Sequence, residues 1–97
     1  MPMTTVVTRD VPARFRGFLA SVMLEIAPGV YVAPKQTKAV RERVWKVLSE
    51  WYDASGQGAL VMTWRDNNQP GQLAIQNLGD PPKKIVDLDG VLLVQHE

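Results

Sequence analysis

Apolar and polar positions near the N-terminus predict a strand followed directly by a helix. Val6 and Val7 are β-branched and flanked by threonines, which is typical of a half-buried strand. Pro12 ends the strand and suits the first position of a helix, because its missing N–H would have no partner there. Apolar residues then recur with a period of about 3.6. This predicts a helix whose stripe is Phe15, Phe18, Leu19, Val22, Met23 and Ile26.

The rest of the pattern predicts a second helix and four more strands. Pro28-Gly29 marks a turn before a strand at 29–33, and Thr37 is a good N-cap for a helix that runs to about Tyr52. The stripe of this helix is Val40, Val44, Val47, Leu48 and Trp51, and its polar face carries Lys38, Arg41, Glu42, Arg43, Lys46 and Glu50. Further strands are predicted at 59–65, 72–78 and 91–94, with a hairpin loop at 66–71 and a turn at 87–90.

This order of elements predicts an α+β fold in a single domain, residues 1–97. Two helices of this length cannot cover both faces of the sheet, so both are expected on one face of a mainly antiparallel, ferredoxin-like sheet, with a C-terminal strand added. Segment 59–65 alternates apolar residues on both faces, which favours burial on both sides, as in a face-to-face homodimer.

Composition adds few constraints on function. Eleven basic residues against ten acidic ones give no overall field, so a nucleic-acid site must come from local clustering of charge. The absence of cysteine excludes disulfides and thiolate metal sites. Neither a long apolar run nor a secretory pattern is visible, and a cytoplasmic location is therefore expected.

Four segments together resemble a known family over nearly the whole chain. They are T-R-D-V-P-A-R-F-R-G at 8–17, E-I-A-P-G-V-Y-V at 25–32, V-M-T-W at 61–64 and V-D-L-D-G-V-L-L-V at 86–94. This combination resembles the CRISPR-associated adaptation protein Cas-two, in its type I-E branch. The resemblance implies a ferredoxin-like homodimer that bridges two dimers of the Cas-one integrase and holds a protospacer DNA duplex during spacer acquisition. Many members are also described as metal-dependent endonucleases acting on RNA or duplex DNA.

The link between the first strand and helix is the first candidate site, because it can present Arg9, Asp10, Arg14 and Arg16 at one rim. Helix starts usually favour acids, so two arginines there suggest an anion that offsets them. The resemblance assigns phosphate contacts to Arg14 and Arg16, and also to a basic pair that corresponds to Lys83 and Lys84. The alternative interpretation of the two arginines is an ordinary solvated helix end, and that of the two lysines is a solubilising loop.

Asp10 is the candidate catalytic residue and Mg²⁺ ligand. The resemblance implies that the two aspartates of a dimer hold the metal, and carboxylate oxygens suit Mg²⁺ or Mn²⁺. Counted back from V-P, however, the acidic position can fall on Arg9, a cation that would repel a metal. Asp10 can equally serve only to shape the turn into the helix. Both interpretations stay open at this point.

The C-terminal segment 85–97 is the candidate partner-binding strand. The resemblance places it near the Cas-one contact, and the residues concerned are Asp87, Leu88, Asp89, Val91, Leu92, Leu93 and Val94. Three hypotheses for function follow: a DNA-binding scaffold, a Mg²⁺-dependent phosphodiesterase that uses Asp10, and a ferredoxin-like dimer that binds a small molecule or another protein.

Overall fold

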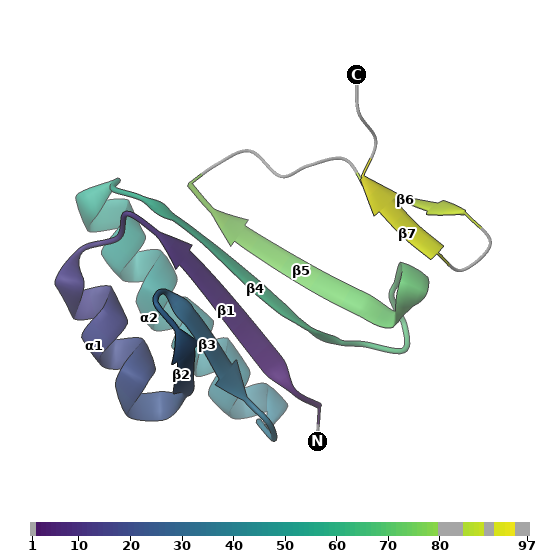
Figure 1. Cartoon of the computed structure of the whole chain (residues 1–97), viewed down its shortest axis with the longest axis horizontal. Coiled ribbons are helices and arrows are strands. Elements are labelled where there is room, and N and C mark those ends of the chain that lie inside the picture. The colour runs from purple at the N-terminus through teal and green to yellow at the C-terminus, as the bar shows by residue number, and fades with distance from the viewer. Residues whose placement is uncertain (1, 80–84, 89–90, 95–97) are drawn as a thin grey trace.

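Two helices and a five-stranded sheet make up the main body of the chain (Figure 1). The computed structural model describes residues 2–79, 85–88 and 91–94. Along the chain the elements are β1 (Thr4–Arg9), α1 (Ala13–Val22), β2 (Leu24–Ala27), β3 (Val30–Ala33), α2 (Lys38–Ser55), β4 (Ala59–Arg65), the 3-10 turn η1 (Pro70–Gln72), β5 (Leu73–Leu78), β6 (Ile85–Leu88) and β7 (Val91–Val94).

The strands of the main sheet lie in the order β2-β3-β1-β4-β5, and every neighbouring pair is antiparallel. Strands β6 and β7 form a separate two-stranded sheet. In Figure 1 both helices lie on the same side of the main sheet. The predicted fold class, an α+β ferredoxin-like fold, is therefore confirmed, with β5 added at one edge.

The core lies between the helices and one face of the sheet. Val6 stands opposite Tyr31 on one side and Met62 on the other, and all three side chains are fully buried. Phe15 and Leu19 from α1 and Val44 and Leu48 from α2 join the same cluster. Because partners in an antiparallel register point to the same face, this cluster shows that both helices cover one face.

The first helix is shorter than the apolar stripe predicts. It ends at Val22, and the next residues leave the helix to form β2, so the extension of the stripe to Ile26 was wrong. Pro28-Gly29 turns the chain, with φ of 78° at Gly29, and pairs β2 with β3. This hairpin pairs Leu24, Glu25 and Ala27 with β3, with a bulge between Glu25 and Ala27, while Leu24 and Ile26 stay mostly exposed.

The predicted turn at 87–90 was also wrong in part. Asp87 and Leu88 belong to β6, where they pair with Leu92 and Val91 of β7. Cross-strand pairing therefore places the backbone of Asp87 and Leu88 in a ladder and not in a turn. Asp89 lies outside the described residues.

Helix α2 has the predicted start, and its predicted polar face is exposed at every position except Arg41. The Thr37 hydroxyl accepts the N–H of Val40 at 3.1 Å, and Gly56 ends the helix in the left-handed region with φ of 61°. Arg41, expected on the polar face, is only 8% exposed, and its guanidinium carbon lies 4.3 Å from the centroid of a Trp64 ring. An arginine can bury its stem in this way while its planar group stacks on an aromatic face.

The other face of the main sheet has no helix over it. Val7 is 40% exposed and Leu73 36% exposed, with Thr5, Val61 and Thr63 half-buried around them. This is the surface on which the sequence predicts a second copy, and the homodimer remains a prediction. In the described part of the chain, neither helix combines the length and apolar character needed to cross a membrane.

Candidate nucleic-acid interface

The link between β1 and α1 is a tight turn built on Asp10. Asp10 has φ of 56°, in the left-handed region that aspartate tolerates better than most residues. Val11 then inserts into the core at 7% exposure, and Pro12 occupies the position before the helix with φ of −56° and ψ of 150°. The sequence-based proposal that Asp10 shapes this turn is consistent with its backbone conformation.

The chain after α2 supports this turn from the other side. The Gln57 side-chain amide donates to the Asp10 carbonyl oxygen at 3.2 Å. A Cβ built on Gly58 would meet the carbonyl oxygens of Arg9 and Asp10 at 2.6 Å. Sequence reasoning missed both residues, although a glutamine between two glycines is a signal for close backbone approach.

Asp10 and Arg16 line one polar hollow of about 400 Å³ together with Thr8, Gly29 and Gln57. Both charged side chains are exposed. The structure therefore brings Asp10 and Arg16 together, as the sequence predicted for this rim, and Arg9 ends β1 immediately before them.

Arg14 points away from that hollow. Its guanidinium carbon lies 4.6 Å from the centroid of a Trp51 ring on α2, and 6.0 Å from the ring of Phe15. Residues two apart on a helix lie on nearly opposite sides, which separates Arg14 from Arg16 around α1. The two arginines thus flank the start of the helix instead of forming a single cluster.

The start of α1 carries an excess of positive charge. Its first turn holds no acid, and the residue before it makes no side-chain capping bond. Throughout the described residues, Arg14 and Arg16 have no ion pair, and Arg14 has only its aromatic contacts. Free N–H groups, the helix dipole and two guanidinium groups therefore all favour an anion at this end of α1.

Tyr31 on β3 has a shifted pKa, and the charge of Arg16 is one of the groups that act on it. The side chain is fully buried, and its hydroxyl has no hydrogen-bond partner of good geometry among the described residues. Burial raises the pKa of Tyr31 to about 12, the Glu25 carboxylate acts in the same direction, and Arg16 opposes it.

This perturbation predicts an alkaline loss of stability. The folded pKa lies above the unfolded value of 10.0. The protonated Tyr31 phenol therefore makes its full contribution to the free energy of unfolding below pH 10. This contribution falls by about 1–2 kcal/mol as the pH rises from 10 towards 12. Urea unfolding at pH 8 and pH 11 should show a larger loss for wild type than for Tyr31→Phe. Equal losses in the two proteins would contradict the assignment.

The metal role of Asp10 receives no support from its surroundings in one chain. In the described residues, no three Asp, Glu, His or Cys side chains come together to hold a metal ion. Asp10 instead shares its hollow with the cation Arg16. A divalent ion would need carboxylates from a second copy, so the catalytic and Mg²⁺ roles of Asp10 stay predictions.

The C-terminal candidates divide into described and undescribed residues. Lys83, Lys84 and Asp89 lie outside the described part of the chain. Leu88, Val91, Leu93 and Val94 expose 43–57% of their surface, which fits a strand pair that contacts a partner.

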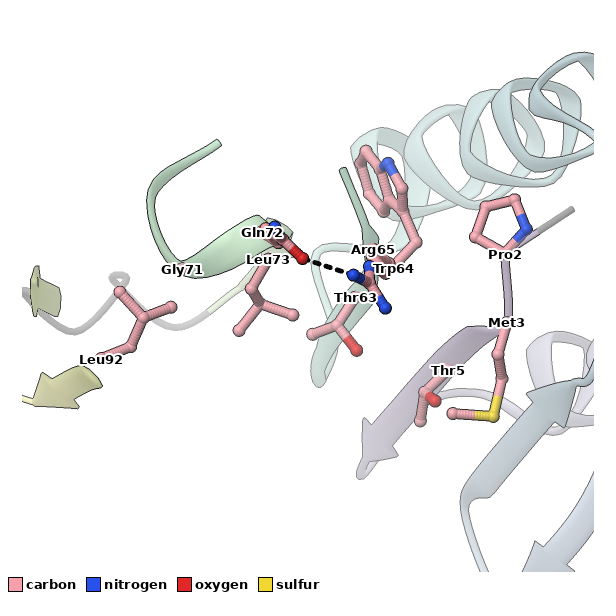
Figure 2. Close-up of a pocket in the computed structure, with 10 residues that line it drawn as sticks. All are labelled: Pro2, Met3, Thr5, Thr63, Trp64, Arg65, Gly71, Gln72, Leu73 and Leu92. Atoms are coloured by element: carbon pink, nitrogen blue, oxygen red, sulfur yellow. Dashed lines mark hydrogen bonds between the residues drawn. The ribbon is translucent and has the colours of Figure 1, made fainter. Parts of the chain in front are cut away.

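Leu92 faces the main body of the chain. It lines a groove of about 560 Å³ with Gly71, Leu73 and Met3 (Figure 2). In Figure 2 Trp64 points to the helix side of the sheet, whereas Thr63 and Leu73 point to the open side. The Arg65 guanidinium donates to the Gln72 side-chain oxygen at 2.5 Å beside this groove. The groove connects the open face of the sheet with the β6–β7 hairpin.

The fold and the site together define the class of this protein. It is a small ferredoxin-like α+β protein with arginines around the start of its first helix. A comparison with protein families matches residues 3–93 to the family described as CRISPR-associated protein (Cas_Cas2CT1978). The match covers nearly the whole chain, and the chain belongs to this family, which confirms the Cas-two resemblance. The type I-E branch remains a prediction.

Proposed function

We propose that two copies of this chain form a DNA-binding scaffold in CRISPR spacer acquisition. In this proposal the dimer acts in the cytoplasm, bridges dimers of the Cas-one integrase, and holds a protospacer duplex by its phosphates. Family membership supports the CRISPR-associated role. The observation that carries the DNA-binding part is the acid-free start of α1 with Arg14 and Arg16 on either side.

The geometry suits backbone phosphates better than a small-molecule pocket. Arg14 and Arg16 are exposed and point to different sides of α1, so they can contact separate phosphates along a groove or strand. Neither lies in a dry, apolar cavity of the kind that small ligands prefer. Such contacts neutralise charge without reading sequence, which suits a scaffold that accepts many different duplexes.

The open sheet face supports the homodimer. A face with Val7 and Leu73 exposed and β-branched residues around them would gain stability if a second copy covered it. Two-fold pairing would repeat the start of α1 on both copies and double the number of phosphate contacts. The exposed side of the β6–β7 hairpin is then available for the integrase.

A charge-matched pair of variants tests the DNA contact. Combined Arg14→Gln and Arg16→Gln substitution is expected to weaken binding of a short duplex roughly 100-fold, because a dimer loses four exposed charge contacts that contribute about 0.7 kcal/mol each. The slope of log affinity against log salt should fall by about 3–4 units for a dimer that loses four phosphate contacts. Fluorescence anisotropy across a salt series measures both quantities.

The control is Arg43→Gln with Lys46→Gln, which removes the same charge from exposed positions on α2. This control should change affinity by less than about threefold. If both double variants weaken binding equally, the net positive charge of the protein accounts for DNA binding, and specific contacts at the start of α1 do not. Unchanged binding by the Arg14 and Arg16 variant, or a protein that sediments as a single chain, would overturn the proposal.

A further inference from the structure

A second group of cations lies at the start of α2, at the other end of the sheet from Asp10. Thr4 at the beginning of β1 pairs with Ala33 at the end of β3, and α2 follows β3 directly. A cavity of about 350 Å³ lies here, lined in part by Gln36, Lys38 and Arg41. This cavity shares no lining residue with the hollow that contains Asp10 and Arg16.

Two buried polar side chains line this cavity, and within the described residues neither the Gln36 side-chain oxygen nor the Arg41 guanidinium has a hydrogen bond or an ion pair. Gln36 is 4% exposed, and within the described residues its side-chain oxygen has no hydrogen-bond partner. Arg41 is 8% exposed, and in the same part of the chain its guanidinium contacts only the ring of Trp64. A buried cation without an anion carries a desolvation cost that a bound anion would offset.

The backbone at this point also favours an anion. The N–H of Val40 is taken by the Thr37 hydroxyl, and that of Arg41 by the Thr37 carbonyl at 3.0 Å. The N–H groups of Lys38 and Ala39 belong to the first turn, where a helix offers no internal acceptor. The first turn of α2 contains no acid, so its positive end is uncompensated by its own side chains.

The charges around the cavity sum to an excess of positive charge. Lys38, Arg41 and Arg65 line it, against the single acid Asp66, although the Arg65 guanidinium donates to Gln72 beside the neighbouring groove. The Asp66 carboxylate accepts the backbone N–H of Asn68 at 2.9 Å, within its own turn. Lys38 also lies 3.8 Å from Glu42, but both side chains are largely exposed, so this pair can open at little cost.

We propose that this cavity binds one phosphate group. Its oxygens would accept from the N–H groups of Lys38 and Ala39 and from the Arg41 guanidinium, with the Lys38 ammonium adding charge. The Gln36 amide can turn about its last bond to present its NH₂ group instead of its oxygen. Donors from a helix end, a buried arginine and a buried amide surround a tetrahedral anion better than a planar carboxylate.

The site stands independently of the DNA scaffold, because it uses different residues at a different end of the sheet. A phosphate in this cavity can come from free phosphate, from a phosphomonoester or from a nucleic-acid backbone. All three present the same oxygens to Arg41 and the helix start, so separate binding experiments must identify the source.

The first experiment titrates the full chain with inorganic phosphate at constant ionic strength, with backbone and side-chain amides followed by ¹H–¹⁵N NMR. Saturable shifts are expected at Lys38, Ala39 and the Gln36 side chain. Arg41→Gln should weaken phosphate binding about tenfold, and the matched control Arg43→Gln by less than about twofold. Lys38→Gln, at an exposed position that does not affect the core, should weaken it about threefold.

Absence of saturable shifts would overturn the proposal, and so would equal losses in Arg41→Gln and Arg43→Gln. If Arg41→Gln does not fold, an unchanged affinity in Lys38→Gln would overturn it instead. A second titration uses a short DNA duplex: competition between duplex and phosphate for the Lys38 and Ala39 amides identifies the nucleic-acid backbone as the source. Phosphate binding without that competition assigns the site to small phosphates, and either result is independent of Arg14 and Arg16.

Discussion

Replacement of Gly58 by alanine is expected to destabilise the fold by at least about 3 kcal/mol, because two costs add at this position. Gly58 has φ of 85°, where an L side chain is strained. Its Cβ would also meet the carbonyl oxygens of Arg9 and Asp10 at 2.6 Å, and these are backbone atoms at the end of β1. Urea unfolding monitored by circular dichroism measures the loss as a shift of the midpoint.

Gly56 provides the matched control for this prediction. It has φ of 61° but no atom within 4 Å of its Cβ position. Gly56→Ala carries only the cost of positive φ, about 1 kcal/mol. The difference between the two variants isolates the contact with the Asp10 turn. If both variants lose the same stability, the end of β1 moves away easily and Gly58 has no special role in holding the candidate site.

Phe15→Ala is expected to cost about 3–5 kcal/mol, because it removes a large and fully buried aromatic side chain. Phe15 is fully buried and lies edge-on to Trp51, with ring centroids 5.5 Å apart. Its removal leaves a cavity between α1 and α2 and takes away an aromatic pair worth about 0.5–1.5 kcal/mol. Against a total stability of about 5–15 kcal/mol for a domain of this size, the variant should be close to unfolding at 37 °C.

Phe18→Ala is the control, since Phe18 contacts the same Trp51 ring at 5.4 Å but is only partly buried. Its loss should be about 1–2 kcal/mol, because less apolar surface leaves water on folding. Near-ultraviolet circular dichroism should change in both variants, since both alter the surroundings of Trp51. A loss in Phe18→Ala as large as that in Phe15→Ala would show that the two phenylalanines share the anchoring of α1.

The anchoring of α1 matters for the proposed function. Phe15 stands between Arg14 and Arg16 in sequence, and its burial turns the two arginines to the two sides of the helix. Trp51 contacts both Phe15 and the Arg14 guanidinium, so one residue of α2 orders both the core and the surface here. The position of the phosphate contacts therefore depends on the packing of the two helices.

The sequence determined those features that depend on local physical chemistry. The β-branched residues of β1, the Thr37 cap, the end of α2 near Gly56 and the alternation in β4 all follow from short-range preferences. Period and order then led to the α+β class. The position of residues 9–16 at the junction of the first strand and the first helix was also predicted. Pro12 ends the strand and precedes the helix, and this local effect does not depend on the rest of the fold.

Only the tertiary structure decided features that depend on distant pairing. The apolar stripe of α1 continues in the sequence to Ile26, which predicts a longer helix. Leu24–Ala27 instead forms a strand that pairs with β3, and no local pattern shows which of these two conformations is more stable. Arg41 fits a polar helix face in sequence, yet the ring of Trp64 from β4 buries it. The approach of Gly58 to Asp10 likewise joins segments that only the folded sheet brings together. Local rules set what each segment can form, and the free energy of packing between segments far apart in the chain selects which of these forms is adopted.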